Sequence, residues 1–170
     1  ALVLALGLDD ADLLEVLQAA QAEGLTREIG VSNFTVALLQ EAIDAVGAEA
    51  IATTQVELHP WLQSPVLVAF AQAQGIHLTS YMTLAYGEVL QEPVITGIAT
   101  QRGWTPAQVV LAWAMQRGFS VIPSSTRRVH LQSNLVAPTL RLDDAAMARI
   151  AALDRGQRLI NPEGLAPLWD

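Results

Sequence analysis

Short apolar runs alternate with helix-like patterns along the chain. Four runs, residues 28–31, 51–58, 76–82 and 119–122, are apolar or β-branched and lie next to glycine or proline. Their length and residue types predict strands. Apolar and polar residues do not alternate cleanly within them, as expected of strands that are covered on both faces.

Between these runs, apolar residues recur at three- and four-residue spacing, which predicts helices. Several helices have a typical start, because a capping side chain or a first-turn proline precedes the pattern. The helices are expected from the acidic run 9–12 to Gly24, from Thr35 to Gly47, from Ser64 to Gln74, around Pro93 to Thr100, from Thr105 to Gly118, near Val129 to Leu135, and from Asp143 through Leu153.

Four strands that alternate with helices predict an α/β fold of parallel βα units. Two architectures fit, a small doubly wound sheet or part of a (β/α)8 barrel. The G-x-G-x-x-G spacing of dinucleotide-binding sheets is absent from the sequence. The opening run 1–8 predicts either a buried strand or a frayed terminus, and residues 154–170, rich in Pro and Gly, predict an extended loop.

The amino-acid composition excludes several classes of enzyme, metal site and partner. All nine basic residues are arginine, and the 170 residues contain neither lysine nor cysteine. Schiff-base and P-loop chemistry, thiol nucleophiles and cysteine-held metals are therefore excluded. The length allows one domain with a real core. A formal charge of −8 makes nucleic acid an unsuitable partner.

The apolar opening run bears on localisation. Eight residues are too few for a membrane span, which needs roughly 20. The run also lacks the basic residues of a signal peptide. We therefore expect a cytoplasmic protein without a membrane partner.

Polar residues follow each predicted strand, at the edge where α/β folds bind their ligands. The serine-rich turn 124–126, followed by Arg127 and Arg128, suits a phosphate, because hydroxyl, guanidinium and free N–H groups all donate to one. Simple helix capping is the alternative for this turn. The other such residues are Ser32, Asn33, Gln55, Glu57, His59, Tyr81, Met82, Thr83, Tyr86 and Gly87.

Several of these side chains also have an ordinary structural interpretation. Tyr81 is typical of a core aromatic, and His59 of a loop residue. His130, one turn after Arg127, either supports an anion site or is solvated. The three histidines are too scattered for a metal site, and neither a Ser–His–Asp arrangement nor a close carboxylate pair is recognisable. We therefore predict no metal and assign no catalytic residue.

Several separate motifs, taken together, resemble the carboxyl-terminal half of the aldo-keto reductases. The resemblance runs from about Gly24 to Asp170, and no match is recognisable before about residue 12. It is strongest to a bacterial branch whose members reduce 2,5-diketo-D-gluconate, methylglyoxal and other small aldehydes. The motifs are Gly30–Phe34 (GVSNF), Thr54–Pro60 (TQVELHP), Thr79–Gly87 (TSYMTLAYG), Ile122–Ser125 (IPSS) and Pro162–Pro167 (PEGLAP).

This resemblance implies the C-terminal half of a (β/α)8 TIM barrel, with about four parallel βα units and a C-terminal loop. Residues 1–170 would form one partial barrel domain, and the tail 154–170 would be the substrate loop. The resemblance also implies NADPH as the cofactor and a small carbonyl compound as the substrate.

The resemblance assigns cofactor contacts residue by residue. Tyr81 would stack on the nicotinamide, and Ser32, Asn33 and Gln55 would hold its carboxamide. Leu84 and Gly87 would lie along the pyrophosphate. The 2′-phosphoribose would contact Ser125, Thr126 and Arg127, and the adenine would lie near Asn134. Many relatives carry lysine at the position of Ser124 and arginine at that of His130, so fewer basic side chains are available here to bind the phosphate.

The Asp, Tyr, Lys and His of the family's proton-transfer tetrad come from the other half of the barrel, and none of their motifs is found. Because the sequence contains no lysine, Tyr86 lacks the cation that a proton-donating tyrosine needs. We therefore expect this chain to supply the cofactor-binding half and to self-associate or pair with an amino-terminal half. The alternatives are a non-catalytic nucleotide-binding or structural half-barrel subunit, and an unrelated α/β domain that binds another phosphate.

Overall fold

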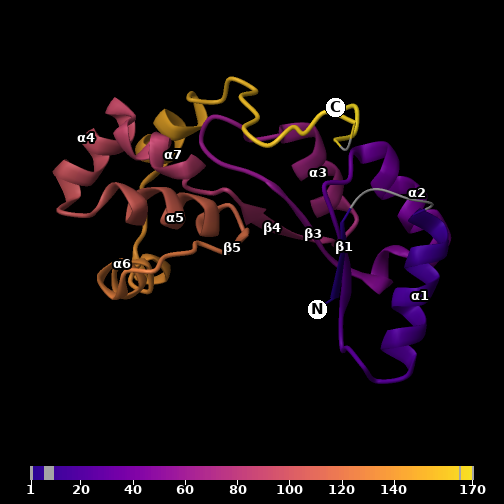
Figure 1. Ribbon diagram of the computed structural model, residues 1–170. Helices are drawn as coiled ribbons and strands as arrows, with labels where there is room; N and C mark the ends of the chain where they lie inside the picture. Colours follow the sequence, from indigo (N-terminus) through magenta and orange to yellow (C-terminus); the bar gives the residue numbers. More distant parts are fainter. Residues whose placement is uncertain (1, 6–9, 165, 170) are drawn as a thin grey trace. The chain divides into compact units, whose positions relative to one another are not determined.

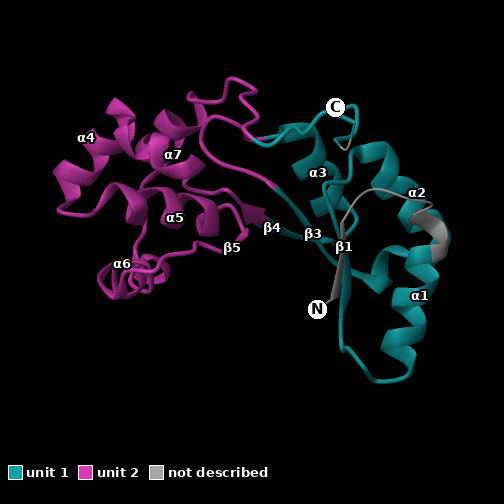
Figure 2. Cartoon of the chain, viewed as in Figure 1, with its two compact units in different colours: residues 1–56, 64–79, 160–170 teal, residues 57–63, 80–159 magenta. Residues whose placement is uncertain are grey.

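The computed structural model describes residues 2–5, 10–164 and 166–169, and its side chains from residue 13 onward. The chain forms two compact units (Figure 2). Unit 1 comprises Ala1–Val56, Ser64–Thr79 and Ile160–Asp170, and unit 2 comprises Glu57–Gln63 and Ser80–Leu159. Parts of the apolar opening run, residues 1 and 6–8, lie outside the described residues.

The elements follow the predicted alternation of strands and helices, which confirms the α/β fold (Figure 1). Unit 1 contains β1 (Leu2–Ala5), α1 (Asp10–Ala22), β2 (Ile29–Ser32), α2 (Val36–Val46), the 3-10 turn η1 (Ala48–Ala50), most of β3 (Ile51–Glu57), α3 (Pro65–Ala73) and the start of β4 (His77–Tyr81). Unit 2 contains the ends of β3 and β4, then η2 (Ala85–Gln91), α4 (Pro93–Arg102), α5 (Pro106–Gln116), β5 (Ser120–Val121), α6 (Arg128–Asn134), η3 (Ala137–Thr139) and α7 (Asp144–Ala151).

The strands are neighbours in chain order, β1-β2-β3-β4-β5. β1 runs parallel to β2, and β2 runs parallel to β3. The sequence predicted four strands, and β1 is a fifth, so the strand alternative for the opening run is the one observed over Leu2–Ala5. All four residues of β2 are buried, which explains why its sequence does not alternate.

Tight contact between two strands shapes the centre of unit 1. Gly30 of β2 lies opposite Thr53 of β3, and a Cβ atom built on Gly30 would lie 2.5 Å from the Thr53 carbonyl oxygen.

Helix α2 begins shortly after β2, with Thr35 as its N-cap. The Thr35 side chain accepts a hydrogen bond from the Leu38 N–H at 3.3 Å. The first residues of α2 are therefore held directly behind the carboxyl end of β2.

Helix α5 is the centre of unit 2. Its residues Val109–Ala114 are all buried, so the helix is covered on more than one face. Trp113 packs edge-on against Phe119, with ring centroids 6.5 Å apart. Thr105 and Gln108 form a capping box at its start, which satisfies backbone N–H groups that the helix leaves open.

The tail after α7 is extended, as predicted. Its described residues, up to Trp169 with the exception of 165, form neither helix nor strand. Throughout the described part of the chain, no helix combines the length and the apolar character that crossing a membrane requires.

Candidate functional site

Three predicted site residues lie together in unit 1, where β2 and β3 end. Ser32 donates a hydrogen bond from Oγ to the backbone oxygen of Gln55 at 2.9 Å, and the Asn33 N–H donates to the same oxygen at 2.9 Å. Asn33 has a left-handed φ of 60°, which turns the chain sharply out of the strand. Hydroxyl and amide groups are thus collected at the carboxyl end of the sheet, and none of the three is charged.

The chain turns tightly after β4 in unit 2. Tyr81 is half-buried at the end of this strand. Ala85, Tyr86 and Gly87 have positive φ values of 48°, 54° and 90°. Two short backbone hydrogen bonds close this turn. The Ala85 N–H donates to the backbone oxygen of Met82 and the Gly87 N–H donates to that of Leu84, both at 2.7 Å. A left-handed conformation is uncommon outside glycine, so packing around the turn must hold it.

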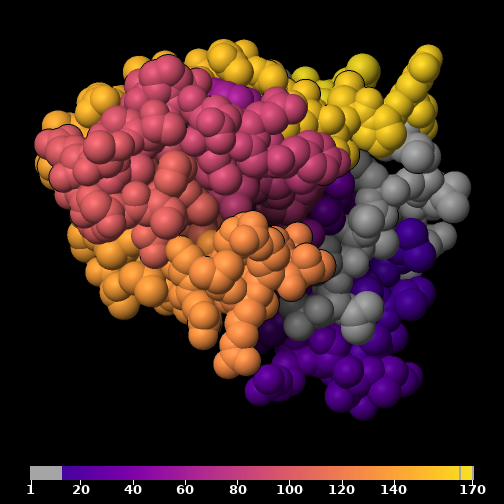
Figure 3. Space-filling model, turned by 60° about the vertical axis from the view of Figure 1, so that its left-hand side comes forward, coloured from indigo at the N-terminus to yellow at the C-terminus, as the bar shows by residue number. Residues whose placement is uncertain are grey.

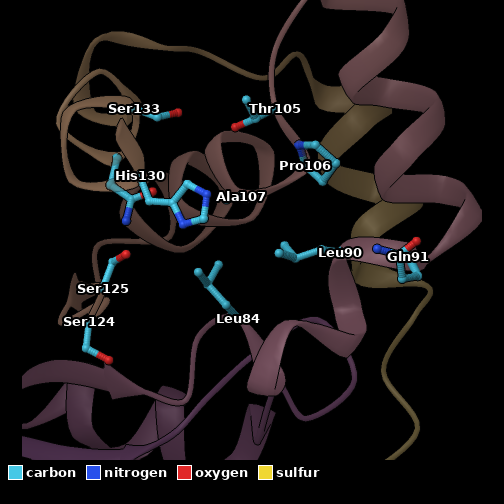
Figure 4. Close-up of a pocket in the computed structure, with 11 residues that line it drawn as sticks. Leu84, Leu90, Gln91, Thr105, Pro106, Ala107, Ser124, Ser125, His130 and Ser133 are labelled. Atoms are coloured by element: carbon cyan, nitrogen blue, oxygen red, sulfur yellow. The ribbon is translucent and has the colours of Figure 1, made fainter. Parts of the chain in front are cut away.

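A cavity of about 310 Å³ lies beyond this turn, entirely within unit 2. The side chains of Leu84 and Leu90 reach into it from the start and the end of η2, and that of His130 reaches into it from α6 (Figure 4). In the space-filling view, α6 lies against the segment that carries α4 and α5 (Figure 3). The cavity is lined by Leu84, Leu90, Gln91, Thr105, Pro106, Ala107, Ser124, Ser125, His130, Ser133 and Asn134.

The lining of this cavity indicates the chemistry of its ligand. Four apolar side chains provide flat walls, and hydroxyl and amide groups provide donors and acceptors. No acidic residue lines the cavity. An apolar site with a few polar groups and a volume near 300 Å³ is typical of small-molecule and cofactor sites. Such a lining suits a small organic molecule better than a metal ion.

The serine-rich turn leads from β5 to α6 beside the cavity. The Ser125 hydroxyl accepts a hydrogen bond from the Arg127 N–H at 3.1 Å. This bond fixes the turn, but it does not reach the N–H groups inside α6, whose N-cap Arg127 offers no side-chain cap. Capping of α6 therefore does not account for Ser125.

Two arginines follow this turn and remain accessible. Arg127 and Arg128 are exposed. Within the described residues, neither guanidinium forms an ion pair. A phosphate group at the edge of the cavity would meet donors that have no competing acid.

The structure groups the predicted residues unevenly. Leu84, Ser125 and Asn134 line one cavity. Thr126 and Arg127 adjoin Ser125 in the exposed turn, and Gly87 lies in η2. Ser32, Asn33 and Gln55 belong to unit 1, and Tyr81 belongs to unit 2.

Sequence reasoning missed half of the cavity wall. Leu90, Gln91, Ala107 and Ser133 carry no motif, and Thr105-Pro106 was interpreted only as a helix start. The signal that could have found Thr105 and Ser133 is weak, because Thr105 is itself the predicted helix start and Ser133 is marked only by its neighbour Asn134.

A buried ionic cluster was also missed. Glu57 and His59 are both 0% exposed, and Glu57 Oε1 lies 2.9 Å from His59 Nε2. From the sequence we interpreted His59 as a typical loop residue and assigned no partner to Glu57. Among the described residues no group of three or more His, Cys, Asp or Glu side chains could hold a metal ion. Glu57 instead contacts two residues later in the chain, Leu159 and Arg158.

Comparisons with known proteins point to one family. The model of the Aldo/keto reductase family matches residues 8–155. The match begins at residue 8, so placing its start near Gly24 was wrong; α1 carries helix periodicity but no motif that could have shown the resemblance.

Individual relatives and solved structures agree with this match. The methylglyoxal reductase DkgB of Yersinia pestis is 59% identical over 160 residues, which cover 94% of this chain and 60% of the relative. A crystal structure of a 2,5-diketo-D-gluconic acid reductase B has a TM-score of 0.93 at 35% identity and covers 100% of this chain and 63% of its own. A Gox0644 variant in complex with NADPH has a TM-score of 0.85 at 34% identity and covers 91% and 57%. The chain thus spans about three fifths of the length of the curated relatives it matches.

Proposed function

Because the chain belongs to the aldo/keto reductase family, we propose that it supplies the NADPH-binding part of an oxidoreductase that reduces small aldehydes and ketones. Methylglyoxal and 2,5-diketo-D-gluconate are the substrates we infer, since the relatives named above are a methylglyoxal reductase and a 2,5-diketo-D-gluconic acid reductase. The observation that carries the proposal is the cavity of unit 2, which Ser125 and Asn134 line beside the exposed Arg127.

The adenosine end of NADPH fits this cavity. Asn134 would hold the adenine edge between the apolar walls, and Ser125, Thr126 and Arg127 would bind the 2′-phosphoribose. Charge-assisted hydrogen bonds from an arginine to a phosphate are among the stronger polar contacts in proteins. The NADPH complex of a structural relative at 34% identity supports NADPH as the cofactor.

The nicotinamide end would lie where the strands end. Ser32, Asn33 and Gln55 are neutral donors and acceptors, which suit a neutral carboxamide, and two hydrogen bonds to the Gln55 backbone oxygen keep the three residues together. The half-buried ring of Tyr81 would stack on the nicotinamide, while Leu84 and Gly87 would follow the pyrophosphate. When bound, the cofactor supplies hydride to a carbonyl carbon.

We infer that residues 1–170 form one partial domain, the C-terminal half of a (β/α)8 barrel, with the tail 154–170 as its substrate loop. The sequence contains no lysine, so the lysine of the Asp-Tyr-Lys-His tetrad cannot come from this chain. The chain alone therefore has no assigned catalytic residue, and we expect it to self-associate or to pair with an amino-terminal half.

Titration with NADPH tests the cofactor assignment, with quenching of Trp and Tyr fluorescence as the readout. We expect a saturable signal, and its absence overturns the assignment. A parallel assay follows methylglyoxal reduction. Turnover by this chain alone would contradict the missing tetrad. If NADPH binds but turnover stays absent after addition of a relative's amino-terminal half, the non-catalytic subunit is favoured instead.

Light scattering tests the expected self-association. We expect a species larger than one chain at micromolar concentration, because an open sheet edge and uncovered apolar surface favour pairing. A monodisperse monomer would contradict this expectation.

A further inference from the structure

The carboxylate of Glu57 contacts residues that lie about a hundred positions later in the chain. Glu57 is the last residue of β3 and is completely buried. Its Oε1 atom accepts a hydrogen bond from the Leu159 N–H at 2.7 Å. Its Oε2 atom lies 3.9 Å from Nη1 of Arg158, whose side chain is 12% exposed. One buried acid thus contacts two successive residues of the tail, all within unit 2.

The residues after Glu57 hold the same part of the tail. The backbone oxygen of Trp61 accepts hydrogen bonds from the Arg155 N–H at 3.2 Å and from the Gln157 N–H at 3.0 Å. The Arg155 guanidinium lies over the Trp61 ring, 4.2 Å from its centroid. The Gln63 N–H donates to Asp154 Oδ1 at 3.2 Å. We call Glu57–Gln63 the anchor segment and Asp154–Leu159 the tail base.

Among these contacts, the hydrogen bond between Glu57 and the Leu159 N–H contributes most to the stability of the tail base. Hydrogen bonds to a charged group contribute about 1.5–3 kcal/mol, and removing one partner leaves the other unsatisfied and buried. Trp61 contributes its backbone oxygen, which any residue would supply, and a ring contact with the exposed Arg155 guanidinium, which is weaker than a buried hydrogen bond to a carboxylate. The position of the tail base therefore depends on the identity of residue 57 more than on that of residue 61.

The pairing of Glu57 with His59 does not explain the acid by itself. The two residues are neighbours in one segment, and a hydroxyl or amide at position 57 could also accept from His59 Nε2. Only a carboxylate can bind His59 and the Leu159 N–H through one oxygen while its second oxygen faces the Arg158 guanidinium.

We propose that Glu57 is a positioning residue that fixes the tail base, and through it the start of the segment that approaches the carbonyl substrate. The substrate part of this statement rests on the proposed function, in which residues 154–170 form the substrate loop. The anchoring itself stands on the contacts within unit 2.

Hydrogen exchange of the full chain tests the anchoring, read at the Leu159 amide. We expect Glu57→Leu to accelerate exchange there by about 10- to 100-fold, the equivalent of one lost hydrogen bond to a charged group. Glu57→Gln keeps an oxygen acceptor and should accelerate it less. Trypsin provides a second readout, because it cleaves after Arg155 and Arg158, and cleavage should rise in the same order.

Thr54→Val is the matched control, since it removes another buried polar atom of β3, a hydroxyl that has no hydrogen-bond partner among the described residues. It should leave exchange at Leu159 unchanged. Exchange that rises equally at Leu159 and along α5 would show general loosening and overturn the proposal, as would unchanged exchange at Leu159. If Glu57→Leu does not fold, Glu57→Gln and Arg158→Met carry the same comparison.

NADPH titration separates this proposal from the proposed function. Glu57 lies outside the cofactor residues, so Glu57→Gln should bind NADPH as the wild type does. A wild-type chain that fails to bind NADPH overturns the proposed function, while the exchange result still decides the role of Glu57.

Discussion

Arg117 donates a hydrogen bond from Nη1 to the side-chain oxygen of Gln63 at 3.0 Å. Gln63 is buried, and its amide nitrogen donates to the backbone oxygens of Pro60, Ile150 and Ala151 at 2.9, 3.0 and 3.2 Å. Burial lowers the pKa of Arg117, while the nearby Asp154 raises it in part. One glutamine side chain thus joins the end of α5, the anchor segment and the end of α7.

Replacing this glutamine should destabilise unit 2. Gln63→Leu removes the donor of three carbonyl groups and leaves the half-buried Arg117 guanidinium without this acceptor. We expect the free energy of unfolding to fall by about 2–4 kcal/mol, measured by urea denaturation. Gln72→Leu on the exposed face of α3 is the control and should change stability by less than about 0.5 kcal/mol. Equal effects of the two variants would contradict the role of Gln63.

Local chemistry made most helices predictable from the sequence. Thr35 and Thr105 cap their helices through their side chains, and Asp143 does the same for α7. Each of these starts depends on residues within four positions of one another, so the sequence pattern contains all of the information. The strand β5 is shorter than predicted, Ser120–Val121 instead of residues 119–122, because strand ends depend on pairing.

Distant contacts made the remaining features unpredictable. The sequence predicts only a loop through Gly87 after the third strand, yet residues 85–91 form η2, with Ala85 and Tyr86 in a left-handed conformation that no local pattern indicates. Glu57 accepts a hydrogen bond from Leu159, which lies 102 positions later in the chain. The cavity likewise needs Leu90, Thr105 and Ser133 to meet in space. Only the residues with a motif, such as Ser125, were available to sequence reasoning.

The close approach of β2 and β3 predicts a severe effect at one glycine. In Gly30→Ala the new Cβ would lie 2.5 Å from the Thr53 carbonyl oxygen and 2.8 Å from its Cγ2 atom. Backbone cannot yield as a flexible side chain does, so we expect a loss of about 2–4 kcal/mol of folding free energy. Thermal unfolding followed by circular dichroism measures it.

Gly97 provides the control for this substitution. It lies within α4, and the nearest atom to a new Cβ is Nη2 of Arg149 at 3.7 Å, an ordinary contact. Gly97→Ala should raise stability by about 0.5–1 kcal/mol, because alanine favours a helix interior. A Gly30→Ala protein as stable as the wild type would show that the strands can separate freely.

The cap of α7 predicts a dependence of stability on acid. The pKa of Asp143 is lowered, first by the hydrogen bond from the Ala146 N–H and then by Arg102. The folded chain therefore holds the proton of Asp143 less tightly than the unfolded chain does. The stabilisation is present above the ordinary aspartate pKa of about 3.9 and is lost as the pH falls through the lowered folded value.

Asp143→Asn isolates this contribution, because asparagine still caps the helix but carries no charge. We expect the variant to be less stable than the wild type at pH 7 and the difference to shrink as the pH approaches 3. Urea midpoints across this range measure the difference, and other carboxylates cancel in the comparison. A constant difference between pH 7 and pH 3 would show that the charge of Asp143 contributes nothing.

The exposed guanidinium of Arg127 should bind the 2′-phosphate, the group that distinguishes NADPH from NADH. Arg127→Ala is expected to raise the Kd for NADPH about tenfold or more, the equivalent of one charge-assisted hydrogen bond, and to leave the Kd for NADH nearly unchanged. Fluorescence titration with each nucleotide measures both. Arg149→Ala on α7 removes the same charge away from the cavity lining and should affect neither value. Equal weakening of both nucleotides by Arg127→Ala would instead place the arginine on a phosphate that they share, and an unchanged NADPH affinity would remove it from the site.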